Sequence, residues 1–128
     1  MSVFTTSELA YLQSQPLMRF ASASTEGRPD VAPVVFDVDG DDILTGGFDI
    51  AHTVRYRNIQ FNPRVSVVVD DLASVNPWSP RGIKIIGTAT IEDVDGILRF
   101  RISPDVIISW ALNDTTPGIP KMDRRKVH

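Results

Sequence analysis

The sequence predicts a mainly β (α+β) protein, an antiparallel barrel of six or seven short strands with a few short helices. Segments rich in β-branched residues recur at near-regular spacing along the 128 residues, and turn-forming Gly, Pro, Asn and Asp separate most of them. One basic helical segment is inserted near the middle, at residues 52–61. With 42% hydrophobic residues, a chain of this length can bury one substantial core, so we expect a single globular domain.

The N-terminal third predicts a short helix followed by a three-stranded meander. Thr6 or Ser7 can cap the helix, because a hydroxyl oxygen there accepts a hydrogen bond from a free N–H of the first turn. Alternating segments at 17–24 and 31–38 predict a hairpin across the turn sequence TEGRP. The acidic turn DGDD then leads into a third short strand at 43–45.

The central segment, HTVRYRNIQFNPRVSVVVDD at residues 52–71, predicts a basic helix that leads into an apolar strand. Asn62-Pro63 ends the helix, because proline lacks the N–H for the next hydrogen bond and forces the residue before it out of the α region. The valine-rich run after it predicts a strand buried on both faces or nearly so. The side chains expected to pack the helix against the sheet are Val54, Tyr56, Ile59 and Phe61.

The C-terminal half predicts the longest strand and a less regular end. Residues 72–82 contain two prolines and predict an extended loop. Residues 83–91 alternate over the longest stretch, with Gly87 at a bulge or at a close approach of two backbones. The remaining predicted elements are a strand at 97–102, one helical turn at Ser103-Pro104 and an apolar run at 106–112.

The end of the chain and the distribution of charge both bear on partners. We expect residues 1–112 to form the barrel domain, and residues 113–128, rich in Thr, Pro, Gly and charge, to form an arm or a disordered tail. The formal net charge is −3, from 13 basic and 16 acidic residues, with the basic side chains gathered between 51 and 84 and at the C-terminus. A duplex nucleic acid would require a broader basic face, so no nucleic-acid partner is expected. A small anionic ligand suits the central basic patch better.

Composition excludes several kinds of catalytic site. The chain has no cysteine and two histidines, so it lacks the ligands of zinc, di-iron and iron–sulfur centres and has no thiol nucleophile. No serine lies in a G-x-S-x-G motif. Neither a metal site nor a hydrolase site is expected. The lack of cysteine is compatible with a reducing cytoplasm, where we expect the protein to reside, with neither an export signal nor a membrane span.

Three segments carry a resemblance to a known family: ELAYLQSQPLMRFASASTEGRPDVAPVVF, HTVRYRNIQFNPRVSVVVDD and PWSPRGIKIIGTATI. The most specific patterns in them are [ST]-x-[KR]-x-x-x-[IV]-x-x-NPR at 53–64 and W-x-P-R-G at 78–82. In this order and spacing, the chain as far as Trp110 resembles the split β-barrel flavin- and deazaflavin-binding proteins related to pyridoxamine 5'-phosphate oxidase. Within that family it is most similar to the actinobacterial deazaflavin-dependent (F420-dependent) oxidoreductases.

This resemblance implies a homodimeric split barrel with two cofactor sites at the subunit interface, each lined by both subunits. The expected cofactor is the deazaflavin coenzyme F420, and FMN is the alternative. Hydride transfer to or from a small organic substrate is then the chemistry of the cofactor, so no catalytic acid or base of the protein is required. An FMN-dependent oxidase or reductase, and a non-catalytic flavin- or haem-binding protein of the same fold, stay open as alternatives.

The resemblance also implies which residues bind the cofactor. Thr53 and Arg55 match the hydroxyl and basic pair that hold the cofactor phosphate, and Arg57 is a further candidate. Val54 stands in place of a second basic residue and Gly82 in place of a side-chain amide, and both changes weaken the case for tightly bound FMN. The residues expected around the ring are Pro33, Val34 and Val35 on one strand, Arg81, Gly82 and Ile83 on another, and the aromatic candidates Trp78 and Trp110.

The chemistry of the residue types agrees with these assignments. A guanidinium presents a planar fork of charged donors that suits a phosphate. Arg57 lies two positions after Arg55, about 200° around the helix axis, so both bind one ligand only if its anionic part wraps the helix end. Judged without the resemblance, the same two arginines are equally compatible with a solvated helix surface. Judged in the same way, Trp78 and Trp110 are more typical of residues that pack in the core or at a subunit interface than of cofactor contacts.

Overall fold

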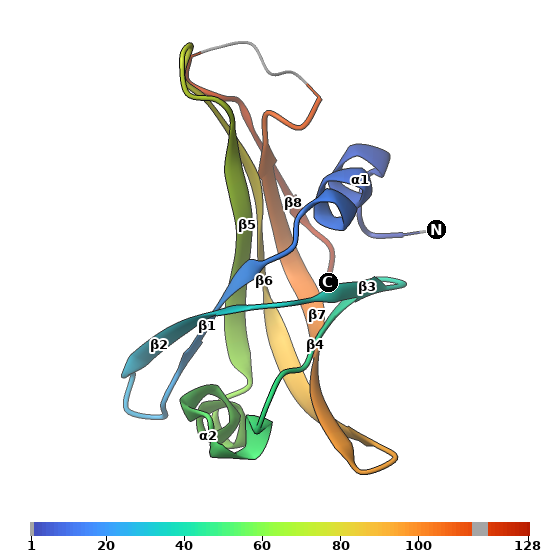
Figure 1. Cartoon of the computed structure of the whole chain (residues 1–128), viewed down its shortest axis with the longest axis vertical. Helices are drawn as coiled ribbons and strands as arrows, with labels where there is room; N and C mark the ends of the chain where they lie inside the picture. Colours follow the sequence, from blue (N-terminus) through green and yellow to red (C-terminus); the bar gives the residue numbers. More distant parts are fainter. Residues whose placement is uncertain (1, 114–117) are drawn as a thin grey trace.

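The computed structural model describes residues 2–113 and 118–128, which form one antiparallel sheet of eight strands and two α-helices (Figure 1). The elements are α1 (Thr6–Ser14), β1 (Met18–Ala23), β2 (Pro29–Val34), β3 (Asp37–Asp39), β4 (Asp42–Thr45), the 3₁₀ turn η1 (Ile50–His52), α2 (Val54–Phe61), β5 (Arg64–Ser74), β6 (Ser79–Val94), β7 (Ile97–Trp110) and β8 (Met122–Lys126). The strand order is β2-β1-β5-β6-β7-β4-β3, and β8 pairs with β7. The predicted mainly β split barrel is confirmed, with eight strands instead of six or seven.

The two ends of this strand order meet where the chain passes from β2 to β3. The sequence predicted a single strand at 31–38, and this was wrong: β2 pairs with β1, whereas β3 pairs with β4. The chain therefore leaves one ladder and joins another between Val34 and Asp37. The Thr45 hydroxyl of β4 donates a hydrogen bond of 2.7 Å to the Val35 carbonyl at this junction, which holds the ends of the sheet together.

The core lies on one face of the sheet, because side chains alternate between the two faces of a strand. Phe20, Val67, Ile85 and Ile107 stand opposite one another across β1, β5, β6 and β7, and each is at most 2% exposed. Phe20 and Phe100 meet edge to face with ring centroids 5.5 Å apart. The valine run, predicted to be buried on both faces or nearly so, is buried on the core face and half-buried on the outer face.

Strands β5, β6 and β7 are longer than predicted. The extended loop predicted at 72–82 is instead the end of a hairpin, with Leu72 paired to Pro80. The helical turn predicted at Ser103-Pro104 is also wrong, because β7 continues through it. A register shift at Gly87 lets β7 include Pro104, since the pairing runs from Ile86–Val106 directly to Gly87–Pro104. The close approach predicted at Gly87 is confirmed: a Cβ there would lie 2.0 Å from the Ser103 carbonyl oxygen.

Helix α1 begins one residue earlier than its predicted caps imply. Thr5, rather than Thr6 or Ser7, is the N-cap: its hydroxyl accepts from the Glu8 N–H, and the Glu8 carboxylate accepts from the Thr5 N–H. Of the arm or disordered tail predicted at 113–128, the described residues 122–126 form β8, so this part of the arm belongs to the sheet. Residues 114–117 lie outside the described residues.

Helix α2 lies at the lower end of the sheet in Figure 1, below β5. It ends at the predicted position, with Asn62 as the C-cap. Asn58 fixes it to β1 through a buried hydrogen bond of 3.0 Å from its side-chain amide to the Ser22 hydroxyl. Ile59 is buried as predicted, whereas Val54 and Phe61 are 52% and 71% exposed and do not pack against the sheet. Neither helix in the described part of the chain is long and apolar enough to cross a membrane.

Candidate functional site

Arg55 lies in the first turn of α2 and is half-buried. Its Nε is a buried nitrogen without a hydrogen-bond partner among the described residues. Gly47 lies beside it, since a Cβ on that glycine would be 3.5 Å from an Arg55 Nη atom. A buried donor that lacks an acceptor costs about 1–3 kcal/mol. An anion bound at this guanidinium would offset that cost, so the residues at the start of α2 fit a phosphate.

Thr53 is the N-cap of α2, and its hydroxyl is engaged within the protein. The hydroxyl donates to the Ile50 carbonyl at 2.6 Å and accepts from the Tyr56 N–H at 3.2 Å. Thr53 can donate to a phosphate only after giving up the bond to Ile50, because a hydroxyl has one hydrogen. Its predicted role in binding phosphate stays a prediction.

Arg57 is exposed and lies on another side of α2 from Arg55. It lines a hollow of about 490 Å³ between the β1–β2 turn and the helix, and Arg55 is not among the residues that line this hollow. This separation agrees with the rotation of about 200° between the two positions. The two arginines therefore present donors to two places rather than to one.

Gly82 is one of the predicted ring-binding residues of β6, and it is buried beneath Trp110. A Cβ at Gly82 would lie 2.6 Å from the Trp110 ring and 2.8 Å from the Val69 carbonyl oxygen, so only glycine fits. Ile83 and Val34 are core residues, so their side chains face away from any ligand on the outer face, to which they offer their backbone alone. Pro33 and Val35 are exposed at and just beyond the end of β2.

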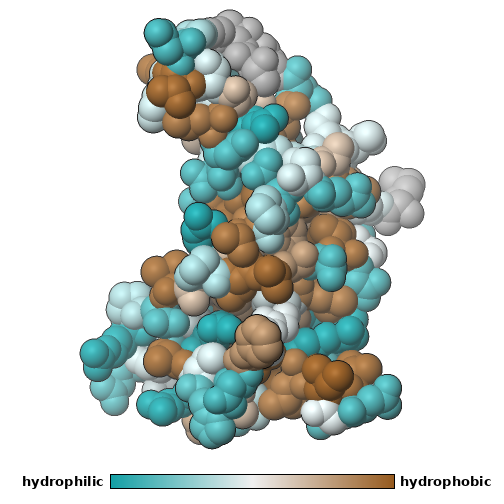
Figure 2. All heavy atoms as spheres, in the orientation of Figure 1, coloured by the Kyte–Doolittle hydropathy of each residue, from teal (hydrophilic) through white to brown (hydrophobic). Residues whose placement is uncertain are grey.

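Trp78 lies at the tip of the β5–β6 hairpin and is 60% exposed. A hydrophobic area at the upper left of Figure 2 covers this tip. The exposed side chains there, Val75 and Trp78, do not belong to the core. Trp78 is thus available to a ligand or a partner, but its own chain gives it little to pack against.

Arg81 is engaged in a cluster that joins α1 to the β5–β6 hairpin. Its Nε and one Nη donate to the Asp71 carboxylate at 2.7 and 3.0 Å, and its guanidinium lies 5.1 Å from the centre of the Tyr11 ring. Tyr11 donates to the same carboxylate at 2.8 Å. The hydrogen bond from Arg81 holds the pKa of Asp71 below its usual value, while burial and then Asp71 raise the pKa of Tyr11. Two of the donors of Arg81 are therefore already used.

The predicted cofactor residues form two groups that lie far apart in one chain. Thr53, Arg55 and Arg57 are at the start of α2, just before β5, whereas Gly82 pairs with Asp70 six residues along β5 from Arg64. Six residues of strand span about 20 Å. Figure 1 shows α2 at the lower end of the molecule and the tip of the β5–β6 hairpin at the upper end. One chain does not bring the two groups together.

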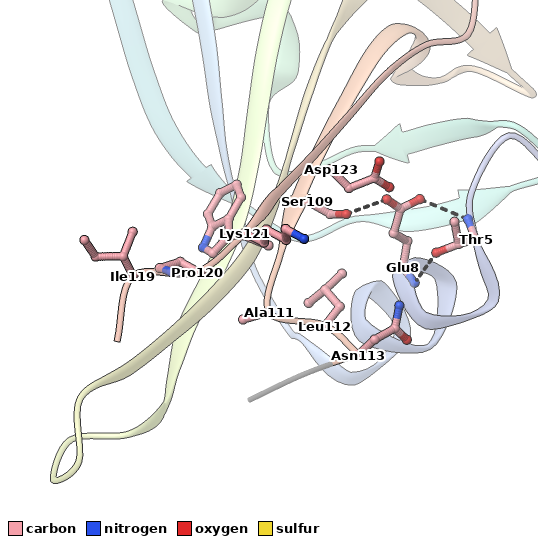
Figure 3. Close-up of a pocket in the computed structure, with 11 residues that line it drawn as sticks. Thr5, Glu8, Ser109, Ala111, Leu112, Asn113, Ile119, Pro120, Lys121 and Asp123 are labelled. Carbon is pink, nitrogen blue, oxygen red and sulfur yellow. Dashed lines mark hydrogen bonds between the residues drawn. The ribbon is translucent and has the colours of Figure 1, made fainter. Parts of the chain in front are cut away.

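A third cluster, not predicted from the sequence, lies where α1 meets β7 and β8 (Figure 3). The Glu8 carboxylate is 1% exposed and accepts from the Ser109 hydroxyl at 2.7 Å and from both Arg125 Nη atoms at 2.6 and 2.9 Å. Burial raises the pKa of Glu8, but the hydrogen bonds from Arg125, Ser109 and the Thr5 N–H outweigh burial and leave it below 4.5. A pocket of about 730 Å³ adjoins this cluster, with Trp110 and Lys121 in its lining.

The sequence contained a signal for only half of this cluster. The T-x-x-E pattern from Thr5 to Glu8 is that of a capping box and could have identified both residues. No local pattern connects Glu8 to Arg125, which lies 117 positions later in the chain.

Comparison with known proteins gives a family and a relative. A family profile described as pyridoxamine 5'-phosphate oxidase matches residues 5–115. A curated relative, the 5a,11a-dehydrotetracycline/5a,11a-dehydrooxytetracycline reductase of Streptomyces rimosus subsp. rimosus, is 32% identical over 131 aligned positions. The alignment covers 94% of this chain and 92% of the relative.

Solved structures share the fold at lower identity. A haem-binding protein from Mycobacterium smegmatis is 15% identical with a TM-score of 0.72, over 97% of this chain and 59% of that one. A FAD-binding protein from Mesorhizobium loti is 17% identical with a TM-score of 0.64, over 77% of this chain and 85% of that one. At these identities the likeness concerns the fold alone.

Proposed function

The chain belongs to the pyridoxamine 5'-phosphate oxidase family, and we propose that it is an oxidoreductase that transfers hydride between coenzyme F420 and a small organic substrate, with FMN as the alternative cofactor. The reductase from Streptomyces rimosus supports the reaction class, because the two chains align over nearly their whole lengths. Its name also makes a tetracycline-like polycyclic compound the first substrate to test.

The observation that carries the cofactor proposal is the buried Arg55 Nε beside Gly47, which has no hydrogen-bond partner in the part of the chain that the structure describes. In the proposed complex Arg55 holds the cofactor phosphate, because a guanidinium forms charge-assisted hydrogen bonds with phosphate oxygens. Val54 and Gly82 offer no polar side chain where FMN-binding members of the family keep one, which favours the deazaflavin.

The cofactor supplies the hydride chemistry when it is bound. The chain's own contribution is a site that binds the cofactor, orients it and excludes water. Gly82 lets the Trp110 ring lie directly against the backbone of β6, because it has no side chain. The half-buried Trp110 above it provides an aromatic wall.

Two features support the proposal that the working unit is a homodimer. In the proposed dimer a second chain completes each site, because the phosphate-binding and ring-binding groups of one chain are separated by about 20 Å along β5. The outer face of the sheet also lacks a covering layer among the described residues. Val31, Ala21, Ser66, Ile86 and Val106 form a row of small and apolar residues across it, with Val31 65% and Ile86 37% exposed.

Titration of the purified protein with F420 and with FMN, each at low and high salt, tests the proposal. We expect F420 to bind more tightly, with an affinity that falls as salt rises, because exposed charge contacts are screened over about 10 Å at 0.1 M salt. Tighter binding of FMN, or no salt dependence, would refute F420 and favour the FMN alternative. A haem-type absorption spectrum in purified protein, with neither flavin bound, would favour the haem-binding alternative.

A further inference from the structure

The pocket where α1 meets β7 and β8 has one apolar wall and one charged wall. Its volume of about 730 Å³ is typical of pockets that hold drug-sized ligands. Figure 3 shows its lining residues on three sides, from α1, from the end of β7 and from the start of β8. We refer to it as the Trp110–Lys121 pocket, after one residue of each wall.

The apolar wall can take the flat face of a ring system. It consists of Trp110 and Leu112 at the end of β7 and of Ile119 and Pro120 just before β8. Trp110 is half-buried, whereas Ile119 is fully exposed, so an apolar ligand would remove hydrated hydrophobic surface from water. An indole ring also stacks favourably on another aromatic ring.

The charged wall carries one positive and one negative side chain. Lys121 directly precedes β8 and Asp123 is the second residue of that strand, and both are exposed and line the pocket. Two positions of extended chain span about 7 Å, and side chains two positions apart project to the same side. An ammonium and a carboxylate therefore face one ligand together.

Glu8 is the other acid in the lining, and its charge is neutralised by the protein itself. Both Arg125 Nη atoms donate to the Glu8 carboxylate, at 2.6 and 2.9 Å. Arg125 also donates to Asp123 at 2.9 Å, but the Asp123 side chain stays 59% exposed and can bind a second cation. Among the described residues of the lining, Lys121 and Asp123 thus carry the charge that is open to a ligand.

The pocket also lies beside the strand to which the cofactor ring is assigned. Trp110 lines the pocket and pairs with Gly82, where a Cβ would lie 2.6 Å from the indole ring. A substrate site must adjoin the ring, because the reacting atoms have to come within about 3–3.5 Å of each other. The pocket meets this requirement through the residue that it shares with Gly82.

We propose that the Trp110–Lys121 pocket binds the substrate, and that it selects a planar polycyclic compound with both a protonated amine and an acidic enol. The inference deepens the proposed function and rests on it for the substrate class. Tetracyclines have this chemistry, since one end of their fused rings carries a dimethylammonium group and an enolate. The rings pack against Trp110, the enolate binds Lys121 and the ammonium binds Asp123.

Titrations with two probes test the pocket without relying on activity. The probes are tetracycline and 4-dedimethylaminotetracycline, which keeps the rings and the enol but lacks the amine. Each is titrated by calorimetry into the protein with and without F420, in buffer with EDTA, because tetracyclines chelate metal ions. We expect Lys121→Ala to weaken both probes about fivefold, the upper range for an exposed charge contact. Asp123→Asn should weaken tetracycline by a similar factor and leave the amine-free probe unchanged.

Lys126→Ala is the matched control, because it removes an exposed cation from the other end of β8 and should leave both affinities unchanged. Equal tetracycline binding by the wild type and by every variant would refute the pocket and leave the reaction class standing. An equal loss for both probes in Asp123→Asn would also refute it, because the carboxylate would then act through Arg125 and the fold.

The remaining outcomes separate the pocket from the proposed function. Absence of tetracycline binding, both with and without F420, overturns the inference, while the F420 titration decides the cofactor by itself. Tetracycline binding with the expected pattern of variants, in a protein that does not bind F420, would support the pocket and refute the cofactor.

Discussion

Arg55 is the single residue on which the cofactor proposal depends most. Its buried Nε has no acceptor among the described residues, and Gly47 lies next to one of its terminal nitrogens. Loss of a charge-assisted hydrogen bond to phosphate costs about 1.5 to 3 kcal/mol. We therefore expect Arg55→Ala to weaken F420 binding by that amount, measured by calorimetry or fluorescence titration.

Two variants define the specificity of this result. Arg55→Lys should give an intermediate affinity, since lysine keeps the charge but lacks the planar fork. Arg124→Ala on β8 removes a guanidinium remote from α2 and should bind as the wild type does. Unchanged affinity in a folded Arg55→Ala variant would remove Arg55 from the site.

At the scale of the elements, the Glu8–Arg125 pair joins the first helix to the last strand. The Arg125 side chain is 27% exposed and that of Glu8 is 1% exposed, so removal of the arginine leaves a buried carboxylate with fewer partners. We expect Arg125→Ala to lower the free energy of unfolding by about 2 to 3 kcal/mol, somewhat less than for a fully buried pair. Urea unfolding at pH 7 measures this change.

A double variant tests whether this loss of stability comes from the buried Glu8 carboxylate that Arg125→Ala leaves without its partner. In Glu8→Gln/Arg125→Ala the carboxylate is replaced by a neutral amide, so the combined loss should be smaller than the sum of the two single losses. Strictly additive losses would show that the pair is not coupled, in conflict with the contacts at 2.6 and 2.9 Å.

The same carboxylate predicts a pH dependence. Its pKa in the folded protein is below 4.5, the value expected when it is unfolded, so the unfolded chain takes up the proton first as the pH falls. The stability that Glu8 contributes is complete above about pH 4.5 and is lost as the pH falls through the folded pKa. Glu8→Gln should therefore show a weaker decline in unfolding free energy between pH 5 and pH 3, about the range of carboxylate titration. An unchanged decline would contradict this role.

At the scale of the whole molecule, the proposal requires two chains. Each site would combine the start of α2 from one chain with the strand around Gly82 from the other, across the outer face of the sheet. An interface of this type buries on the order of 1,200–2,000 Å² or more. We expect sedimentation to show a dimer whose melting temperature rises with protein concentration.

A substitution at the centre of the outer face tests this arrangement. Ile86→Asp places a charge in the row across β1, β5 and β6, so it should dissociate the dimer and abolish cofactor binding. Ile97→Asp is the control, because Ile97 is 72% exposed at the start of β7 and lies outside this row. A folded monomer of Ile86→Asp that still binds the cofactor would refute the shared site.

Several features of this protein are determined by the sequence alone. The end of α2 at Asn62-Pro63 and the alternation that buries one face of each long strand are consequences of local stereochemistry. The requirement for glycine at position 82 is different, because the Trp110 ring and the Val69 carbonyl impose it through strand pairing. The resemblance gave the family, which the profile over residues 5–115 confirms, and gave the candidate residues at α2 and at the start of β6.

Only the tertiary structure decided which segments pair and where the candidate residues lie. The division of 31–38 between β2 and β3, the pairing of β8 with β7, and the bond between Glu8 and Arg125 all join parts of the chain that carry no matching local signal. The same is true of the position of Arg57 beside the β1–β2 turn. The physical reason is that propensity and periodicity act within a few residues, whereas strand order depends on how the whole core is buried.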